Sequence, residues 1–362
     1  MTGDVAIIGA GIVGCSTAYF LAREGVRVTV HDRAGIAAGA SGRNNGLVEH
    51  PYDAPSAALF HESVELLQDL LGPAMPADPV GALLLCDGEA AARELAEHYA
   101  RFPELAPELL HPNQVRAREP MLADGLWGCR LATGYPISPW EATVAVAERA
   151  RAAGARFALE APVSLDVLRD RAEQVVVAAG AASAELLAGF VAPETVRPLW
   201  GVIVLVEMAQ SPRQPIIEGT VTRGLTTGTI TDESPFTLLP SPSWLAVGST
   251  MLEGAEPSGE EWAPRLLARG ARFVPALARA ATRGTLVCAR PKSFDNRPIL
   301  GRVPSEDHLW LASGHGGRGM SLGVASGRMI AEAVLTGDER GIPAELRARR
   351  LVGAPQPHGV TR

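Results

Sequence analysis

The chain opens with a block of hydrophobic residues that ends in a glycine-rich turn. Residues Val5 to Ile8 are all apolar, which predicts a short strand buried on both faces. The next residues follow the pattern G-x-G-x-x-G, and an apolar helical pattern then runs from Ile12 to Glu24. A second apolar strand is expected from Val26 to Val30, directly before His31 and Asp32. This order of elements predicts the start of a parallel α/β sheet.

Similar patterns recur in the second half of the chain. Residues Val175 to Ala181 predict another buried strand that ends in small residues. A strand beginning at Leu309 precedes the glycine-rich loop G-H-G-G-R-G and a helix from Leu322 to Leu335. The runs Phe236 to Pro240 and Trp244 to Gly248 flank a Ser-Pro-Ser turn and predict a β-hairpin. Further helices are expected at Glu94 to Arg101 and at Pro264 to Phe273, the second opened by its proline.

The glycines of the first turn indicate what this region binds. Gly9, Gly11 and Gly14 let the chain turn sharply, admit a pyrophosphate against the backbone and pack the helix onto the sheet. The first-turn N–H groups of the helix are expected to be free, so its N-terminus forms an anion site. Asp32 follows at about the spacing of a carboxylate that accepts a hydrogen bond from an adenosine ribose. The segment therefore predicts a dinucleotide site.

Composition excludes several other classes of protein. The chain has 362 residues, 47% of them hydrophobic, which suffices for one large core or two moderate ones. Its net charge of -7 argues against nucleic acid and against an anionic membrane surface. The apolar start lacks the basic region of a signal peptide, and no run reaches the length of a membrane span, so we expect a cytoplasmic protein. The four cysteines are scattered, and no disulfide framework or metal site is predicted.

Seven blocks follow one another along the chain: G-A-G-I-V-G, A-S-G-R-N-N-G at Ala40 to Gly46, Ile137 to Trp140, V-V-V-A-A-G-A, Arg197 to Gly201, Arg290-Pro291 with Asp295 and P-I-L-G, and G-H-G-G-R-G. In this order the whole chain resembles the FAD-dependent D-amino acid oxidase superfamily, above all its glycine oxidase and sarcosine oxidase branch. The resemblance implies FAD with its ring between two domains and a substrate on one flavin face. The C-terminal glycine loop and its helix would then face the flavin.

The resemblance also implies an α/β fold in which a discontinuous, Rossmann-type FAD-binding domain joins a substrate domain of antiparallel β-sheet and helices. We expect residues 1–77, 133–198 and 286–362 in the first domain, and residues 79–132 and 199–285 in the second. The residues expected to bind FAD are Gly9, Gly11, Ile12, Val13, Gly14, Asp32, Arg33, Ala40, Ser41, Arg43, Asn44, Asn45, Gly46, Val163, Ala179, Gly180, Cys288, Gly314, His315, Gly316, Gly317, Arg318, Gly319 and Met320.

Four residues are expected at the substrate. Arg290 matches the arginine that grips the substrate carboxylate in glycine oxidase-like proteins, unless it pairs with a structural carboxylate such as Asp295. Glu49 stands before the H-x-Y element of His50 and Tyr52, where sarcosine oxidase-like sequences carry arginines. A carboxylate at this place suits a substrate ammonium or another basic group, unless Glu49 is a surface residue. His50 and Tyr52 complete the set.

The flavin link and the electron acceptor leave alternatives open. Cys288 aligns with the cysteine that forms a thioether to the flavin in monomeric sarcosine oxidases, although non-covalent FAD is favoured. Sarcosine oxidases use a lysine beside the flavin to reduce O2, and the corresponding strand, Trp244 to Thr250, has none. Lys292 is the only lysine of the chain and is expected either near the flavin or at the surface.

The sequence therefore predicts an enzyme that uses FAD to oxidise the C–N bond of an amine or amino acid, giving an imine and, with O2, hydrogen peroxide. One alternative is a dehydrogenase that passes electrons from an amino acid or a 2-hydroxy acid to another acceptor or a partner subunit. For a hydroxy acid, His50 and His315 are the candidate bases. A non-catalytic flavin-binding subunit is a further alternative. The oligomeric state stays open.

Overall fold

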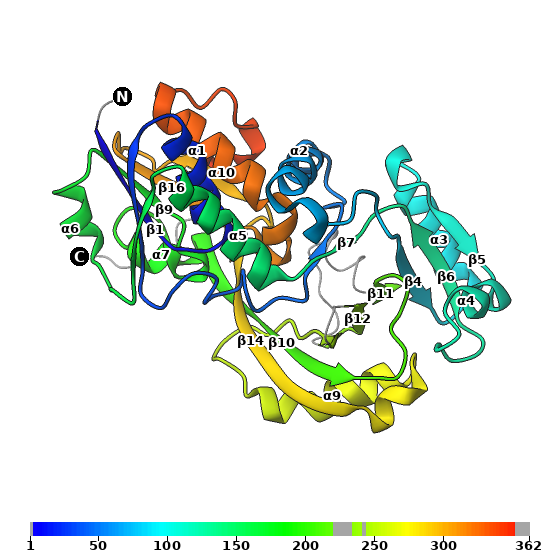
Figure 1. Ribbon diagram of the computed structural model, residues 1–362. Helices are drawn as coiled ribbons and strands as arrows, with labels where there is room; N and C mark the ends of the chain where they lie inside the picture. The colour runs from blue at the N-terminus through cyan, green and yellow to red at the C-terminus, as the bar shows by residue number, and fades with distance from the viewer. Residues whose placement is uncertain (1–2, 220–233, 241–243, 352–362) are drawn as a thin grey trace, which may run out of the picture.

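Two β-sheets organise the protein in the computed structural model, which describes residues 3–219, 234–240 and 244–351. Figure 1 shows helices gathered over the first sheet at the left, while strands of the second sheet spread to the right and the bottom of the view. The long strands β10 (Val196–Glu207) and β14 (Ala281–Ser293) run from the first region into the second. They pair with each other along their length.

The first sheet has the predicted α/β character. Its order is β15–β16–β9–β1–β2–β8, and among these described strands only the β15–β16 pair is antiparallel. The strands are β1 (Asp4–Ile8), β2 (Arg27–Asp32), β8 (Arg156–Leu159), β9 (Gln174–Val177), β15 (Ile299–Arg302) and β16 (Leu309–Ser313). β1 lies inside the sheet with Val5 to Ile8 buried, as its continuous apolar run predicts. The Rossmann-type sheet is confirmed.

Helices α1 (Ile12–Arg23), α5 (Pro139–Ala152) and α10 (Gly319–Thr336) lie side by side over this sheet (Figure 1). Two glycines allow α1 and α10 to approach closely. A Cβ at Gly323 would lie 2.9 Å from Ile12 Cγ2, and one at Gly327 would lie 2.5 Å from Ser16 Cβ. The contact with Ile12 brings the N-terminal ends of α1 and α10 together.

The second sheet has eight strands in the order β14–β10–β13–β12–β11–β4–β6–β5. The remaining strands are β4 (Ala82–Cys86), β5 (Glu108–Leu110), β6 (Trp127–Leu131), β11 (Ile216–Glu218), β12 (Thr237–Pro240) and β13 (Leu245–Gly248). The pairing is antiparallel as expected, except that β4 and β11, from two distant parts of the chain, pair in parallel. The predicted hairpin is confirmed in β12 and β13, where Leu238 faces Val247, while its Ser-Pro-Ser turn lies outside the described residues.

Helix boundaries in this second region differ from the prediction. α3 (Glu89–Tyr99) starts five residues earlier than expected. The proposed proline start of α9 (Gly259–Ala271) was wrong, because Ser258 caps the helix by accepting from Glu261 N at 3.4 Å, and Pro264 lies inside it. The other α-helices and strands of the described residues are α2 (Ala54–Leu71), α4 (Pro112–Arg118), α6 (Leu165–Arg169), α7 (Ser183–Leu186) and the small pair β3 (Leu47–Val48) with β7 (Tyr135–Pro136).

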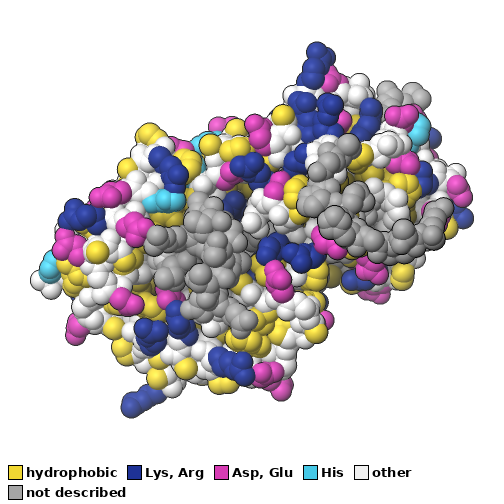
Figure 2. Space-filling model, turned by 180° about the vertical axis from the view of Figure 1, so that it is seen from behind, with side chains coloured by type: hydrophobic (Ala, Val, Ile, Leu, Met, Phe, Trp, Pro, Cys, Tyr) yellow, Lys and Arg dark blue, Asp and Glu magenta, His cyan; other side chains and the backbone are white. Residues whose placement is uncertain are grey.

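The surface carries charges of both signs. Figure 2 shows arginines and acidic side chains interspersed over the visible face, with hydrophobic residues scattered between them. Among the described residues, no helix combines the length and the apolar character needed to cross a bilayer. Two of the expected domain boundaries, after residues 198 and 285, fall inside β10 and β14, which continue without interruption across them.

Candidate active site

The first glycine turn lies where the carboxyl end of β1 meets β9. Gly9 has φ +114°, and an added Cβ would collide with the carbonyl oxygen of Ala178. A Cβ at Gly14 would collide with the carbonyl oxygen of Gly9 itself. Both positions therefore require glycine for conformation and for space.

Asp32 ends β2 beside this turn and holds it in place. Its Oδ2 accepts from Ala10 N at 2.8 Å, and its Oδ1 accepts from Ala34 N at 2.8 Å and Gly35 N at 3.0 Å. A carboxylate has about four acceptor positions, so one remains for a ribose hydroxyl. Asp32 can therefore hold the glycine turn and accept from a ribose hydroxyl at the same time.

The N-terminus of α1 differs from the expectation in one respect. The Ile12 N–H is not free, because it donates to Ser41 Oγ at 3.0 Å. A Cβ at Gly11 would lie 2.9 Å from the same oxygen. The first-turn donors left for an anion therefore belong to Val13 and Gly14.

The loop from Ala40 to Gly46 is braced by a side chain within it. Asn44 Nδ2 donates to Ala40 O at 2.9 Å and to Ser41 O at 3.2 Å, while its Oδ1 accepts from Gly46 N at 2.8 Å. Asn45 is half-buried and the Arg43 side chain is exposed. Asn44 therefore shapes the loop that supplies Ser41 to α1.

The second glycine loop follows β16 at the same sheet edge. Gly314 and Gly316 have φ of +79° and +56°. The side chain of His315 points away from the loop into α10, where its Nε2 lies 2.9 Å from Ser326 Oγ. Ser326 gives its own proton to Leu322 O, so the imidazole is the donor, and burial lowers its pKa to about 4. His315 is thus a neutral anchor of the loop.

The other expected flavin contacts also follow strands of the first sheet. Ala179 and Gly180 come after β9, and Ser313 Oγ donates to Gly180 O at 2.9 Å, which ties the ends of β9 and β16 together. Arg33 follows β2 and is exposed, and Val163 follows β8 and is half-buried. Met320 is buried in the first turn of α10.

Arg290 points from β14 across its neighbour β10. A Cβ at Gly201 would lie 2.5 Å from Arg290 Nη2, so the guanidinium lies over this glycine. Nη1 donates to Thr250 O at 2.8 Å and Nη2 donates to Ser249 Oγ at 2.9 Å. Two of its five N–H groups are used in this way, and three remain for a ligand.

The alternative partner of Arg290 is engaged elsewhere. Asp295 pairs with Arg350 at 2.9 Å. On its other side Arg290 meets the second glycine loop, since a Cβ at Gly317 would lie 3.8 Å from Arg290 Cδ. The arginine therefore lies between β10 and the loop, with no carboxylate among its described hydrogen-bond partners.

Glu49 and Tyr52 form a cluster with Arg318 of that loop. Tyr52 Oη donates to Glu49 Oε2 at 3.3 Å. Burial raises the pKa of the Glu49 carboxyl to about 7, against the opposing effects of the Arg318 charge and the Tyr52 hydrogen bond. Burial also lowers the pKa of Arg318, although Glu49 and Asp53 counteract this. Glu49 is not the surface residue of the alternative interpretation.

Three charged residues of this region lie deep in the protein without being sealed off from solvent. Burial is the largest influence on the pKa of Glu49, Arg290 and Arg318. Yet all three keep part of their surface accessible to solvent. Charged side chains are rarely placed this deep without a ligand or a partner.

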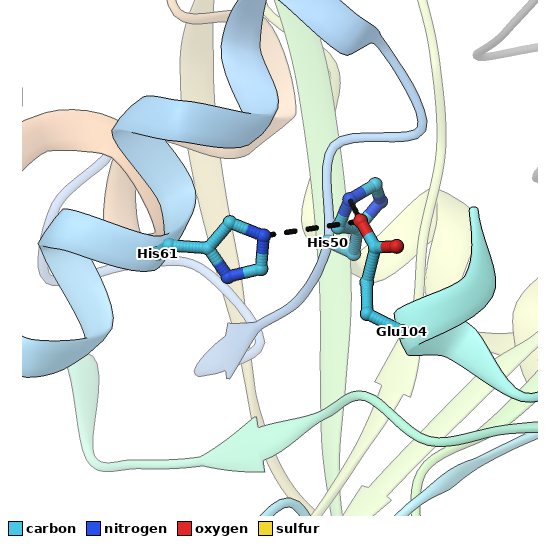
Figure 3. Close-up of side chains that lie close together, drawn as sticks. All are labelled: His50, His61 and Glu104. Carbon is cyan, nitrogen blue, oxygen red and sulfur yellow. Dashed lines mark ion pairs between the residues drawn. The ribbon is translucent and has the colours of Figure 1, made fainter.

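His50 lies behind Tyr52 and contacts two residues that the sequence did not indicate. Its Nδ1 accepts from Tyr52 N at 3.1 Å, and its Nε2 lies 3.2 Å from Glu104 Oε1 in a bent arrangement. His61 approaches the same carboxylate oxygen at 3.8 Å (Figure 3). Burial lowers the pKa of His50 to about 4, so the ring is neutral.

The cluster of His50, His61 and Glu104 has the composition of a metal site, which the sequence did not predict. The hydrogen bond at His50 Nδ1 argues against that use. A neutral imidazole that accepts at Nδ1 carries its proton on Nε2, whereas a metal ligand needs a free lone pair there. The Nε2 proton therefore lies near the Glu104 carboxylate, and Nδ1 accepts from Tyr52, which has a left-handed conformation with φ +56°.

Cys288 and Lys292 lie on the same strand as Arg290. Cys288 is buried opposite Gly201. Burial raises the pKa of its thiol, whereas the positive charges of Arg290 and Arg43 lower it. Lys292 Nζ pairs with Glu253 at 2.9 Å. Lys292 was expected either near the flavin or at the surface. In the structure it pairs with the exposed side chain of Glu253.

These features fit a dinucleotide flavin. Two glycine turns and the N-terminal ends of α1 and α10 meet at the carboxyl edge of one parallel sheet, where the backbone is open to a pyrophosphate. Arg290 and Glu49 lie against the second loop and the start of α10, Arg290 at Gly317 and Glu49 at Ser321.

Comparison with known proteins agrees with this geometry. The sequence pattern of the family described as FAD dependent oxidoreductase matches residues 4–333. Glycine oxidase of Geobacillus kaustophilus is 26% identical over 360 residues, which cover 91% of this chain and 92% of that protein. The solved structure of glycine oxidase from that organism has a TM-score of 0.80 at 23% identity, over 96% of this chain and 98% of that one.

Iminodiacetate oxidase from Chelativorans sp. BNC1 has a TM-score of 0.78 at 24% identity, over 95% of this chain and 98% of that one. At these identities the structural likeness shows a shared fold. The family match extends over most of the chain, from β1 into α10. The protein therefore belongs to the FAD dependent oxidoreductase family.

Proposed function

We propose that this protein oxidises the C–N bond of a small amino acid or a closely related amine. The observation that carries the proposal is that an arginine and a carboxylate lie against the same loop and helix start, Arg290 at Gly317 and Glu49 at Ser321. An amino acid presents the complementary pair of charges. Two of the compared proteins are named glycine oxidase and iminodiacetate oxidase, which supports a small substrate that carries a carboxylate.

Different side chains would bind the two charged ends of the substrate. Arg290 has three N–H groups left and would hold the substrate carboxylate, with Arg318 adding a second positive charge. Glu49 would face the substrate nitrogen. His50 and Tyr52 would act by positioning Glu49, since neither ring nitrogen of His50 is free to take a proton. This arrangement fixes the α-carbon between the two charged ends.

The glycine turns, Asp32, the Ala40 to Gly46 loop and the residues after β9 and β16 would hold FAD, which supplies the hydride acceptor when bound. We favour non-covalent FAD. A thioether at Cys288 needs the thiolate, and burial raises the pKa of this thiol. The division into an FAD-binding and a substrate domain, with β10 and β14 shared between them, and the cytoplasmic location are parts of the same proposal.

We propose O2 as the electron acceptor, with a partner flavoprotein or quinone as the alternative. One observation supports the alternative. Sarcosine oxidases use a lysine beside the flavin to reduce O2, and the only lysine of this chain, Lys292, pairs with Glu253. Turnover in air with hydrogen peroxide formed in proportion to the amine consumed would support the oxidase. Turnover that needs a dye or quinone would support the dehydrogenase.

The experiment that tests the substrate class is anaerobic mixing of the purified flavoprotein with a panel of compounds. The panel contains glycine, N-methylglycine, iminodiacetate, D- and L-alanine, propylamine and glycolate. We expect bleaching of the flavin by at least one amino acid, and slower or no bleaching by propylamine, which lacks the carboxylate. Bleaching by glycolate alone would move the proposal to hydroxy acids.

A further inference from the structure

We propose that the Glu49 carboxylate accepts the proton that the substrate ammonium must lose before its α-hydrogen leaves. This inference rests on the proposed function and deepens it. An alkylammonium has a pKa of about 10, as in lysine, so that fewer than about one amine in a hundred is unprotonated near neutral pH. The nitrogen lone pair is needed to form the C=N bond, so a site that binds the ammonium form gains from a nearby acceptor.

Glu49 is held in a fixed position from both of its ends. Its backbone N–H donates to Ser321 Oγ at 3.0 Å in the first turn of α10. Its carboxylate Oε2 accepts from Tyr52 Oη at 3.3 Å. Tyr52 is itself fixed through the hydrogen bond from its N–H to His50 Nδ1. One carboxylate oxygen is thus oriented by the protein, while Glu49 keeps part of its surface accessible.

The groups around Glu49 set its strength as a base. Burial raises its pKa to about 7, whereas an exposed glutamate is too weak a base to take an amine proton efficiently. From its own segment Tyr52 faces it, and from the second glycine loop Arg318 faces it. Arg318 is in turn influenced by Asp53 and by Tyr99 of α3. Arg318 keeps enough of the carboxylate ionised near neutrality to act.

The proton balance of the step is simple. The ammonium carboxylate form of the substrate gives one proton to Glu49, which leaves a neutral amine, a substrate carboxylate on Arg290 and a neutral Glu49 carboxyl group. The net charge of the site does not change, and no water takes part.

Other described side chains of this region are poorer acceptors. The His50 ring accepts at Nδ1 from Tyr52 and carries its proton on Nε2. His315 donates from Nε2 into α10. The phenol of Tyr52 has a pKa raised well above its usual value, so it is protonated and acts as a donor. Glu49 is the acceptor that the geometry leaves.

The test is the pH dependence of anaerobic flavin reduction by the best compound of the panel, measured for wild type and for Glu49→Gln. For wild type, the ratio of reduction rate to dissociation constant should rise with pH through about 7 and then level off. In Glu49→Gln the rise should move toward the pKa of the free amine. The variant should be about ten- to a hundredfold slower at pH 7.5 and within about threefold of wild type near pH 10.

Calorimetry gives a second readout that does not depend on turnover. At pH 8, 2-aminoisobutyrate, which carries both charges but no transferable α-hydrogen, should bind wild type without releasing a proton to the buffer. Glu49→Gln should release about one proton or bind only at higher pH, because the internal acceptor is missing. Glu207→Gln is the matched control, since Glu207 pairs with Arg283 on the exposed end of β10, and it should behave as wild type.

Tyr52→Phe keeps the test valid if Glu49→Gln does not fold or does not retain FAD. Loss of the phenol donor should raise the pKa of Glu49 and shift the acidic limb of the wild-type profile to higher pH. Identical profiles for wild type, Glu49→Gln and Tyr52→Phe would overturn the inference while leaving the proposed function intact. A flavin that no amine bleaches would overturn the proposed function itself.

Discussion

The substitution Gly201→Ala displaces Arg290 without changing any charge. A Cβ at residue 201 would lie 2.5 to 2.7 Å from three atoms of the guanidinium, about 1 Å inside an ordinary van der Waals contact. Gly201 lies within β10 and has no positive φ, so alanine suits its backbone. The side chain of Arg290 must therefore shift, and its bonds to Ser249 and Thr250 must lengthen or break.

The expected loss of affinity follows from the hydrogen bonds that Arg290 would lose. A hydrogen bond to a charged group contributes about 1.5–3 kcal/mol, so losing one good bond to the substrate carboxylate weakens binding by roughly ten- to a hundredfold. We expect this loss for glycine and the other carboxylate compounds of the panel. Propylamine has no carboxylate to lose, so its dissociation constant should change by less than about threefold.

The assay is the substrate dependence of anaerobic flavin reduction, which gives the dissociation constant separately from the rate. Gly341→Ala is the matched control, because nothing lies within 4 Å of a Cβ at that position. Wild-type affinity for carboxylate compounds in Gly201→Ala would refute the assignment of Arg290 as the carboxylate site. Loss of FAD from Gly201→Ala would show that Arg290 supports the fold or the cofactor instead.

Three further predictions concern the cofactor and the His50 cluster. Gly14→Ala should yield protein without the absorbance of flavin, because its Cβ collides with the Gly9 carbonyl, and a yellow variant with wild-type flavin content would contradict this. Acid denaturation should release FAD equally from wild type and from Cys288→Ser, whereas a flavin adduct in the mass spectrum of wild type would disprove the non-covalent proposal. Zinc should leave the wild-type melting temperature unchanged, because His50 Nε2 carries a proton. A rise in melting temperature with zinc that Glu104→Gln abolishes would instead indicate a metal site.

The parts of the fold that depend on local pattern could be predicted from the sequence. The apolar run of β1 and its G-x-G-x-x-G turn are local features, and the structure places them at the centre of the parallel sheet. The hairpin of β12 and β13 follows in the same way from two apolar runs around a turn. The start of α9 was misjudged because a proline is common at a helix start, whereas Ser258 is the cap.

The contacts of the candidate site could not be predicted in this way, because they join distant segments. Ser249 and Thr250 meet Arg290 only through the pairing of β10 with both β13 and β14. Glu104 and His50 are far apart in the sequence and come together only through the tertiary fold. No periodicity within one segment carries this information. The sequence could not show whether Glu49 lies at the surface or inside, because its burial beside Arg318 depends on the tertiary fold.

The central claim is that the protein oxidises an amine with its bound FAD, and the stoichiometry of a single anaerobic turnover tests it most directly. The fastest amine of the panel is mixed with an excess of the purified flavoprotein, and reduced flavin, ammonia or amine product, and oxo acid are measured together. We expect one reduced flavin for each substrate consumed, together with one released nitrogen product and one oxo acid, since the imine hydrolyses to the last two. Flavin that stays oxidised with every amine, or reduction without a released nitrogen product, would contradict it.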